Sequence, residues 1–319
     1  MTQRYGITVP LAGSSFAEQR DEIVELADLG YTDLWSAEVD NVDAFTPLVL
    51  ASQWAPTLRL GTAIVPVYTR GPALIAQSAA SAGTAAPGNF VLGIGASSNV
   101  IVERWNAVPF ERPYQRVRDT LRFVRSALTG EKIKQDYETF SINGFRLTTP
   151  PPMPVPILVA ALRPGMLRLA GREGDGAIIN WLSPDDVRTV VPYVHEGGES
   201  KEVVARIFVL LTDDADVARG IGRQMIAAYL NVPVYAAFHE WLGRGDVLGP
   251  MWKAWKDGDR KAALAAIPDS VVDELIVHGP AERCREVIQQ YITNGVTTPA
   301  PAVVPFGDPR EAYRALAPR

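Results

Sequence analysis

The sequence predicts one α/β domain folded as a (β/α)8 barrel. Short β-rich runs alternate with longer amphipathic runs, and repeated units of this kind form a parallel sheet with right-handed crossovers. Such a sheet is doubly wound or closed, and eight strand-like runs fit a closed barrel better than a Rossmann sheet. The length of 319 residues fits one large barrel or two ordinary domains, and the 47% of hydrophobic residues can fill a large core. The expected strands are residues 5–9, 32–36, 58–65, 90–94, 155–160, 176–180, 203–211 and 298–304.

The expected helices have local start and stop signals. Residues 15–29 carry apolar side chains on one face with acids between them, and Gly30 follows as a C-cap. Residues 44–55 end just before Pro56. The other expected helices are residues 72–85, 114–128, 164–171, 184–195, 215–230 and 309–316.

One inserted segment, residues 129–154, is predicted to form a β-hairpin. Its two β-like runs, 137–141 and 145–149, flank the Asn-Gly pair at positions 143–144, which is typical of a tight turn.

A second inserted segment, residues 232–277, is predicted to be helical and rich in aromatic residues. It is a lid over the barrel mouth, a subunit interface or plain helical padding. Its tryptophans are Trp241, Trp252 and Trp255. We therefore expect a single domain over residues 1–319 with two insertions.

Composition argues against several partners. The net charge is −5 with acids and bases mixed, and no basic block favours nucleic acid. Cys284 is the only cysteine, so no intrachain disulfide forms, and its helical setting indicates a packing residue. We expect no export signal at the start of the chain, and no apolar run reaches the roughly 20 residues that span a bilayer. These features are compatible with a cytoplasmic protein.

Ligands of such a barrel bind at the C-terminal ends of its strands. Most residues there are small, apolar or neutral, and the histidines (195, 239 and 278) fall in helical or connecting segments, so we expect no metal site. No Gly-x-Ser-x-Gly elbow indicates a serine hydrolase. Such a mouth suits a flat organic cofactor that brings its own chemistry. The segments concerned are residues 10–14, 36–38, 64–70, 96–98, 160–163, 180–181 and 305–307.

The run from residue 90 to 98 is a candidate ligand-binding strand end. Gly93 and Gly95 remove side-chain bulk there, and the Ala-Ser-Ser run that follows offers unhindered backbone N–H groups. A tight turn without a ligand explains these residues equally well. A Rossmann NAD site is disfavoured because Ser98 stands where the third fingerprint glycine belongs.

Glu38 is the clearest ionisable residue at a strand end. It is placed to donate or relay a proton beside a bound ring. The alternative is a structural carboxylate that caps the next segment or pairs with Arg70. Tyr68 and Trp105 are secondary candidates, each more typical of a pocket wall.

Several runs of the sequence resemble the bacterial-luciferase-like superfamily, and in particular its deazaflavin-dependent branch. Glu38 follows the first of these runs, and Trp105 and Pro109 follow the third. The runs are residues 30–35 (GYTDLW), 60–64 (LGTAI), 92–98 (LGIGASS), 155–157 (VPI) and 174–176 (GDG).

The resemblance implies a TIM barrel that binds coenzyme F420, a deazaflavin that transfers a hydride from C5. The central ring of F420 would rest on a bulge in the third strand, where the family has a non-prolyl cis peptide, here between Ala63 and Ile64. Ala96, Ser97 and Ser98 would line the side chain and phosphate of the cofactor, and Gly95 is a further cofactor-binding residue. The other implied cofactor-binding residues are Ala161, Leu162 and Arg163, with Arg163 supplying positive charge beside a helix N-terminus.

The sequence departs from the family at one position. Several relatives have a histidine after the second strand that assists proton transfer, and this chain has Glu38 at that place. The main hypothesis is an F420-dependent oxidoreductase acting on a small carbonyl, imine or activated alkene, and by resemblance a homodimer. The alternatives are an FMN-dependent monooxygenase and a non-catalytic ligand-binding barrel.

Overall fold

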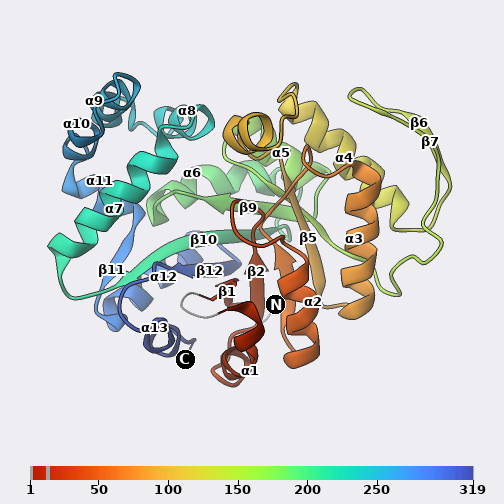
Figure 1. Cartoon of the computed structure of the whole chain (residues 1–319), viewed down its shortest axis with the longest axis horizontal. Coiled ribbons are helices and arrows are strands. Elements are labelled where there is room, and N and C mark those ends of the chain that lie inside the picture. The colour runs from red at the N-terminus through yellow and green to blue at the C-terminus, as the bar shows by residue number, and fades with distance from the viewer. Residues whose placement is uncertain (1–2, 12–14, 319) are drawn as a thin grey trace.

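The computed structural model describes residues 3–11 and 15–318, which form a parallel barrel surrounded by helices (Figure 1). Neighbouring strands pair in parallel in the order β1, β2, β3, β5, β8, β9, β10 and β12. The last strand returns beside β1, so the barrel is nearly closed, and the predicted fold is confirmed. The strands are β1 Gly6–Val9, β2 Asp33–Ser36, β3 Arg59–Thr62, β4 Val65–Pro66, β5 Phe90–Gly95, β8 Ile157–Ala160, β9 Gly176–Asn180, β10 Glu202–Leu211, β11 Val277–Gly279 and β12 Thr298–Val303.

Helices cover the outside of the barrel (Figure 1). Many begin at a proline, whose fixed φ suits the first helical turn. The short strand β11, which pairs with the end of β10, and the π-helix η2 were not predicted. The outer helices are η1 Phe16–Glu18, α1 Arg20–Asp28, α2 Thr46–Trp54, α3 Pro72–Ala85, η2 Val100–Trp105, α4 Pro113–Ala127, α5 Pro164–Arg172, α6 Pro184–His195, α7 Ala215–Leu230, α12 Ala281–Thr293 and α13 Pro309–Ala315. In the described part of the chain, none of the helices has the length and apolar character to span a bilayer.

The middle of the barrel interior is apolar. Alternate residues of each strand point inward, and those at mid-height form one buried cluster. The cluster consists of Trp35, Val91, Leu158, Ile178, Val204 and Ala300. Trp35 is the largest of them, and glycines on both neighbouring strands make room for its ring. A Cβ atom on Gly6 would lie 2.7 Å from Trp35 Cδ1, and one on Gly61 would lie 2.2 Å from Trp35 Cζ3.

Ion pairs fill the end of the barrel where the strands begin. The guanidinium of Arg59 contacts Glu202 with Nη1–Oε2 at 2.9 Å and also pairs with the fully buried Asp33. Thr298 Oγ1 donates to Glu202 Oε1 at 2.7 Å. Burial alone would raise the pKa of Glu202, but the hydrogen bonds and charge of Arg59 outweigh it and hold that pKa below its ordinary value. Ion pairs therefore occupy this end, and the candidate ligand site is the opposite one.

The inserted hairpin is present, but its predicted turn was wrong. Strands β6 Ile133–Asp136 and β7 Ser141–Phe145 pair antiparallel, so Asn143 and Gly144 lie within the second strand. The turn lies instead at residues 137–140, closed by the Tyr137 N to Phe140 O hydrogen bond at 2.8 Å. Both turn aromatics pack against Phe123 of α4, and Gly144, with φ of 86°, sits beside a β-bulge.

The second insertion is helical, as predicted, and has a core of its own. Its helices are α8 Pro233–Trp241, α9 Gly245–Lys256, α10 Arg260–Ala265 and α11 Asp269–Leu275. Leu248, Met251 and Val272 pack there with residues of α7, and the cluster continues to Trp181 and Phe208 at the ends of β9 and β10. Trp252 and Trp255 pack beside this cluster, with Trp252 Nε1 donating to Leu230 O at 2.8 Å, whereas Trp241 packs against the main core of the barrel.

We expect Gly61→Ala to lower the free energy of unfolding by about 1–3 kcal/mol, the usual cost of overpacking a core, because the added Cβ overlaps the Trp35 ring. Gly220→Ala is the matched control: it lies in α7 with no atom within 4 Å of the added Cβ, so a gain of about 0.5–1 kcal/mol is expected. Chemical denaturation measures both. Equal stability of the Gly61→Ala variant and the parent would contradict the packing argument.

Candidate active site

Three of the segments predicted to bind a cofactor meet at the barrel mouth. Strands β3, β5 and β8 are neighbours, with Gly61 opposite Val91 and Gly93 opposite Leu158. The residues that follow these strands therefore lie side by side. Of the other strand-end segments, residues 12–14 lie outside the part of the chain that the structure describes.

The third strand contains a bulge at the predicted position. Gly61 pairs with Val91 and Val65 pairs with Ile94, so one extra residue lies in the third strand between these pairs. Side-chain hydrogen bonds take the place of the interrupted backbone ladder. The Thr62 hydroxyl donates to Gly93 O and accepts from Gly93 N, at 2.8 Å each. The peptide bond between Ala63 and Ile64 is cis, as the resemblance implied.

Small residues surround Ile64 of this bulge. A Cβ on Gly95 would lie 2.9 Å from Ala160 Cβ and 3.2 Å from Ile64 Cδ1. Glycine at this position therefore allows Ile64 and Ala160 to close together over the end of β5. The result is a wall of small apolar groups at the mouth, which suits contact with a flat ring.

The loop after β5 has an unusual backbone. Ser97 has φ of 64°, and Ser98 begins the π-helix η2 by accepting hydrogen bonds from Val102 N at 2.9 Å and Ile101 N at 3.4 Å. Ala96 and Ser97 are half-buried. π-helical turns occur frequently at functional sites. This one keeps residues 96–98, which we call the serine loop, close to the end of β5.

The loop after β8 carries the predicted anion-binding arginine. Ala161 is buried and its N–H donates to Ile178 O at 3.0 Å, whereas Leu162 is half-buried. Arg163 is exposed and is the N-cap residue of α5. Among residues 3–11 and 15–318, no ion pair or hydrogen bond holds its guanidinium. Both its charge and the helix N-terminus are available to an anion.

Glu38 is held by an ion pair. Both carboxylate oxygens accept from Arg70 Nε at 3.0 Å, and Oε2 also accepts from Ala44 N at 3.2 Å. Both side chains of the pair are 19% exposed. The structural alternative for Glu38 therefore describes its present contacts, and its catalytic role stays a prediction. Of the secondary candidates, Tyr68 is buried with its hydroxyl on Glu111 O at 2.5 Å, and Trp105 is 53% exposed on η2.

A cavity lies inside the mouth, directly above the apolar layer. Its enclosed part has room for little more than a water molecule, and the space around it amounts to about 240 Å³ when the adjoining solvent is counted. The bulge residue Ala63 lines it, so the cavity adjoins the proposed ring site. The lining residues are Thr8, Trp35, Ser36, Ala37, Ala63, Ile178, Val204, Arg206 and Ala300.

Arg206 is the functional candidate that the sequence reasoning missed. It lies in the middle of β10, on the inward face shared with Glu202 and Val204. Its burial holds the pKa of the guanidinium below its ordinary value. A charged residue in the middle of the apolar run 203–211, at an inward position, was the available signal.

Aromatic side chains of β9, β10 and the following helices cluster near Arg206, which lines the cavity. The Trp181 ring lies 4.3 Å from that of Phe208 and 5.0 Å from that of Tyr229, and Tyr229 is 6.2 Å from Tyr235 (centroid distances). We call residues 229–241, the end of α7 together with α8, the lid. Burial raises the pKa of Tyr235 to about 12, opposed by the Arg206 charge and the Asn180 side chain. The interpretation of the second insertion as a lid stays a prediction, beside the alternatives of a subunit interface and helical padding.

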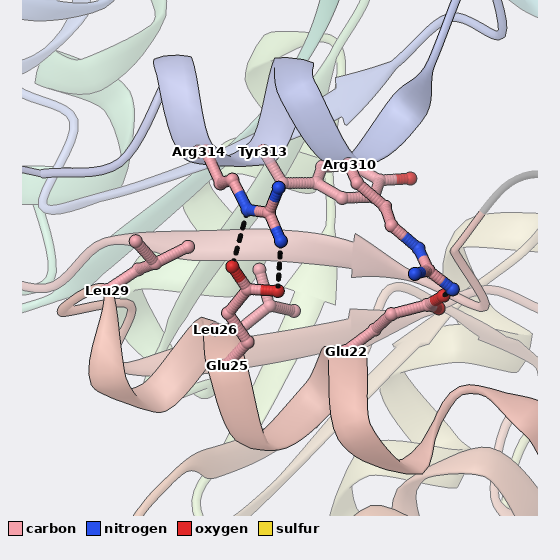
Figure 2. A pocket seen from close by; sticks show the side chains of 7 residues that line it. All are labelled: Glu22, Glu25, Leu26, Leu29, Arg310, Tyr313 and Arg314. Carbon is pink, nitrogen blue, oxygen red and sulfur yellow. Dashed lines mark hydrogen bonds and ion pairs between the residues drawn. The ribbon is translucent and has the colours of Figure 1, made fainter.

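Other polar groups lie away from the mouth or are enclosed. Figure 2 shows a pocket between α1 and α13, on the outside of the barrel, where Glu25 pairs with Arg314 and Glu22 with Arg310. His239 is fully buried in α8, and burial lowers its pKa to about 4. Within the described ranges no three His, Cys, Asp or Glu side chains gather as metal ligands do.

Comparison with known proteins fits this geometry. The family model described as luciferase-like monooxygenase matches residues 4–298. The chain belongs to that family. A 5,10-methylenetetrahydromethanopterin reductase of Archaeoglobus fulgidus is 28% identical to this luciferase-like chain over 287 residues, 86% of each protein.

Two solved structures share the fold. The coenzyme F420-dependent tetrahydromethanopterin reductase of Methanopyrus kandleri has a TM-score of 0.81 at 19% identity, covering 99% of this chain and 98% of that one. An F420-dependent secondary alcohol dehydrogenase, in complex with an F420-acetone adduct, has a TM-score of 0.75 at 17% identity, covering 99% of each chain.

Proposed function

We propose that this luciferase-like protein is an oxidoreductase that uses coenzyme F420 to exchange a hydride with a small carbonyl, imine or activated alkene. The observation that carries the proposal is the bulge at Ala63 and Ile64, packed against Gly95 and Ala160 beside an internal cavity. Relatives and structural neighbours that are F420-dependent by name support the choice of cofactor.

The residues at the mouth suit the parts of F420. The deazaflavin ring would lie on Ala63, Ile64 and Gly95. Ala96, Ser97 and Ser98 would contact its side chain and phosphate, followed by Ala161, Leu162 and Arg163, whose free charge suits an anionic tail. When bound, the cofactor supplies the hydride chemistry, which the side chains at the mouth lack.

The chain itself would exclude water and hold the substrate. Phe208, Trp181 and Tyr229 form an aromatic cluster beside Arg206, and the lid that carries Tyr229 would cover the bound substrate. Glu38 would hold or move a proton once the substrate is in place, with Arg70 fixing the orientation of its carboxylate. We also propose that the enzyme is a cytoplasmic homodimer.

Titration with the two candidate cofactors tests the proposal. We expect F420 to bind and to quench protein fluorescence, with FMN binding at least about tenfold more weakly. The Gly95→Val variant should lose F420 affinity, since its side chain displaces Ile64 and Ala160, and Gly220→Val on α7 is the matched control. Tight FMN binding without F420 binding would favour the monooxygenase that the family name suggests. Binding of neither would favour a non-catalytic barrel.

Arg163→Ala should weaken F420 binding, and the loss should be larger at low salt than at high salt because an exposed charge contact is screened. Arg172→Ala, at the other end of α5 and paired with Glu196, is the control and should leave affinity unchanged. Equal affinities of Arg163→Ala and the parent across the salt range would remove Arg163 from the site.

Glu38→Gln should lower turnover while leaving F420 affinity intact, because the amide keeps an acceptor for Arg70 and Ala44 but cannot donate or accept the catalytic proton. Asp43→Asn is the matched control, since Asp43 also faces Arg70, at 3.7 Å. A lower melting temperature with unchanged turnover would assign Glu38 a structural role.

A further inference from the structure

The guanidinium of Arg206 has no counter-ion within the barrel. No ion pair or hydrogen bond to Arg206 occurs among residues 3–11 and 15–318, and its Nε is fully buried. The other residues of the chain, 1–2, 12–14 and 319, have no acidic side chains. The residue as a whole is half-buried, and a half-buried charge without a protein partner is unfavourable unless water or a ligand neutralises it.

Two more buried polar atoms beside Arg206 lack partners. Thr8 Oγ1 and Trp35 Nε1 are buried without a hydrogen bond in the described part of the chain, and both residues line the same cavity as Arg206. Indole and guanidinium N–H groups only donate, and a hydroxyl can donate. Three residues around one cavity therefore have unused hydrogen-bond donors, which a ligand with hydrogen-bond acceptors would satisfy.

The neighbours of the guanidinium do not neutralise it. Arg206 Cζ lies 5.0 Å from the centre of the Phe208 ring, a cation–π contact that is weaker than an ion pair. The facing phenol of Tyr235 is neutral near pH 7, since burial raises its pKa to about 12. Arg59, at the other end of the barrel, differs from Arg206 because it is paired with two carboxylates, those of Asp33 and Glu202.

We propose that the cavity binds the carboxylate of an anionic substrate, with Arg206 as its counter-ion and Thr8 and Trp35 as further donors. A planar guanidinium pairs with a carboxylate through two parallel hydrogen bonds. Calling this ligand the substrate rests on the proposed function, because the cavity adjoins the bulge at Ala63 where the reacting ring would lie. The substrate is then a small organic acid whose reducible group is held toward that bulge.

The test uses the full chain without cofactor and two matched ligand pairs, benzoate against benzamide and crotonate against crotonamide. Calorimetric titration should show each carboxylate binding at least about tenfold more tightly than its neutral amide. Arg206→Gln should abolish that preference. Arg206→Lys should keep part of it, since lysine retains the charge but lacks the two parallel N–H donors of the guanidinium. Equal binding of acid and amide, or no binding of either by the parent, would overturn the proposal.

Melting temperature separates ligand binding from a structural role. Without ligand, Arg206→Met should melt at or above the temperature of the parent, because it removes a half-buried charge that has no counter-ion. A clearly lower melting temperature would mean that the fold itself uses the charge, against the proposal. Arg260→Gln, which removes an arginine stacked 3.8 Å over Trp255 in the helical insertion, is the control and should bind carboxylates like the parent.

F420 titration of Arg206→Gln distinguishes the substrate from the cofactor tail. We expect unchanged F420 affinity, since Arg163 lies at the predicted tail site on another strand end. Loss of F420 affinity would assign Arg206 to the cofactor and overturn the proposal. If the parent binds no F420 yet prefers carboxylates through Arg206, the proposed function fails while the carboxylate site stands.

Discussion

The fit of Trp35 between Gly6 and Gly61 is the constraint on which the rest of the barrel depends. A barrel of this size has an interior that side chains must fill, and one indole occupies most of its mid-height because both flanking strands lack a side chain there. Below it, Arg59, Asp33 and Glu202 close the floor with ion pairs. The unfilled space is thereby confined to the upper end, where the cavity lies directly on the indole.

Much of this arrangement was readable from the sequence, because it depends on periodicity. Eight short apolar runs separated by amphipathic ones predicted the barrel, and the small residues around Gly95 indicated the strand end that lines its mouth. The hairpin turn was misplaced because Asn143 and Gly144 serve a bulge, while Phe140 packs against α4 and fixes the turn elsewhere. A local turn signal cannot report such a tertiary contact.

The site was only half predictable for a related reason. The residues after β3, β5 and β8 follow one another in readable motifs, but Thr8, Arg206 and Tyr235 come from two distant strands and a lid helix. Their meeting depends on closure of the barrel, which places β10 close to β1 through β12. Glu38 shows the opposite case: its position was predicted, yet its carboxylate is engaged by Arg70, a partner that the sequence offered as one of two alternatives.

The core that α9 to α11 share with α7 has a consequence for how such a protein can diversify. Leu248, Met251 and Val272 stabilise that segment without help from the half of the barrel that carries the bulge and the serine loop. Mutations there can change the helices beside β9 and β10 while the ends of β3, β5 and β8 keep their geometry. Selection can thus change substrate specificity without changing the proposed cofactor site, although both belong to one continuous chain.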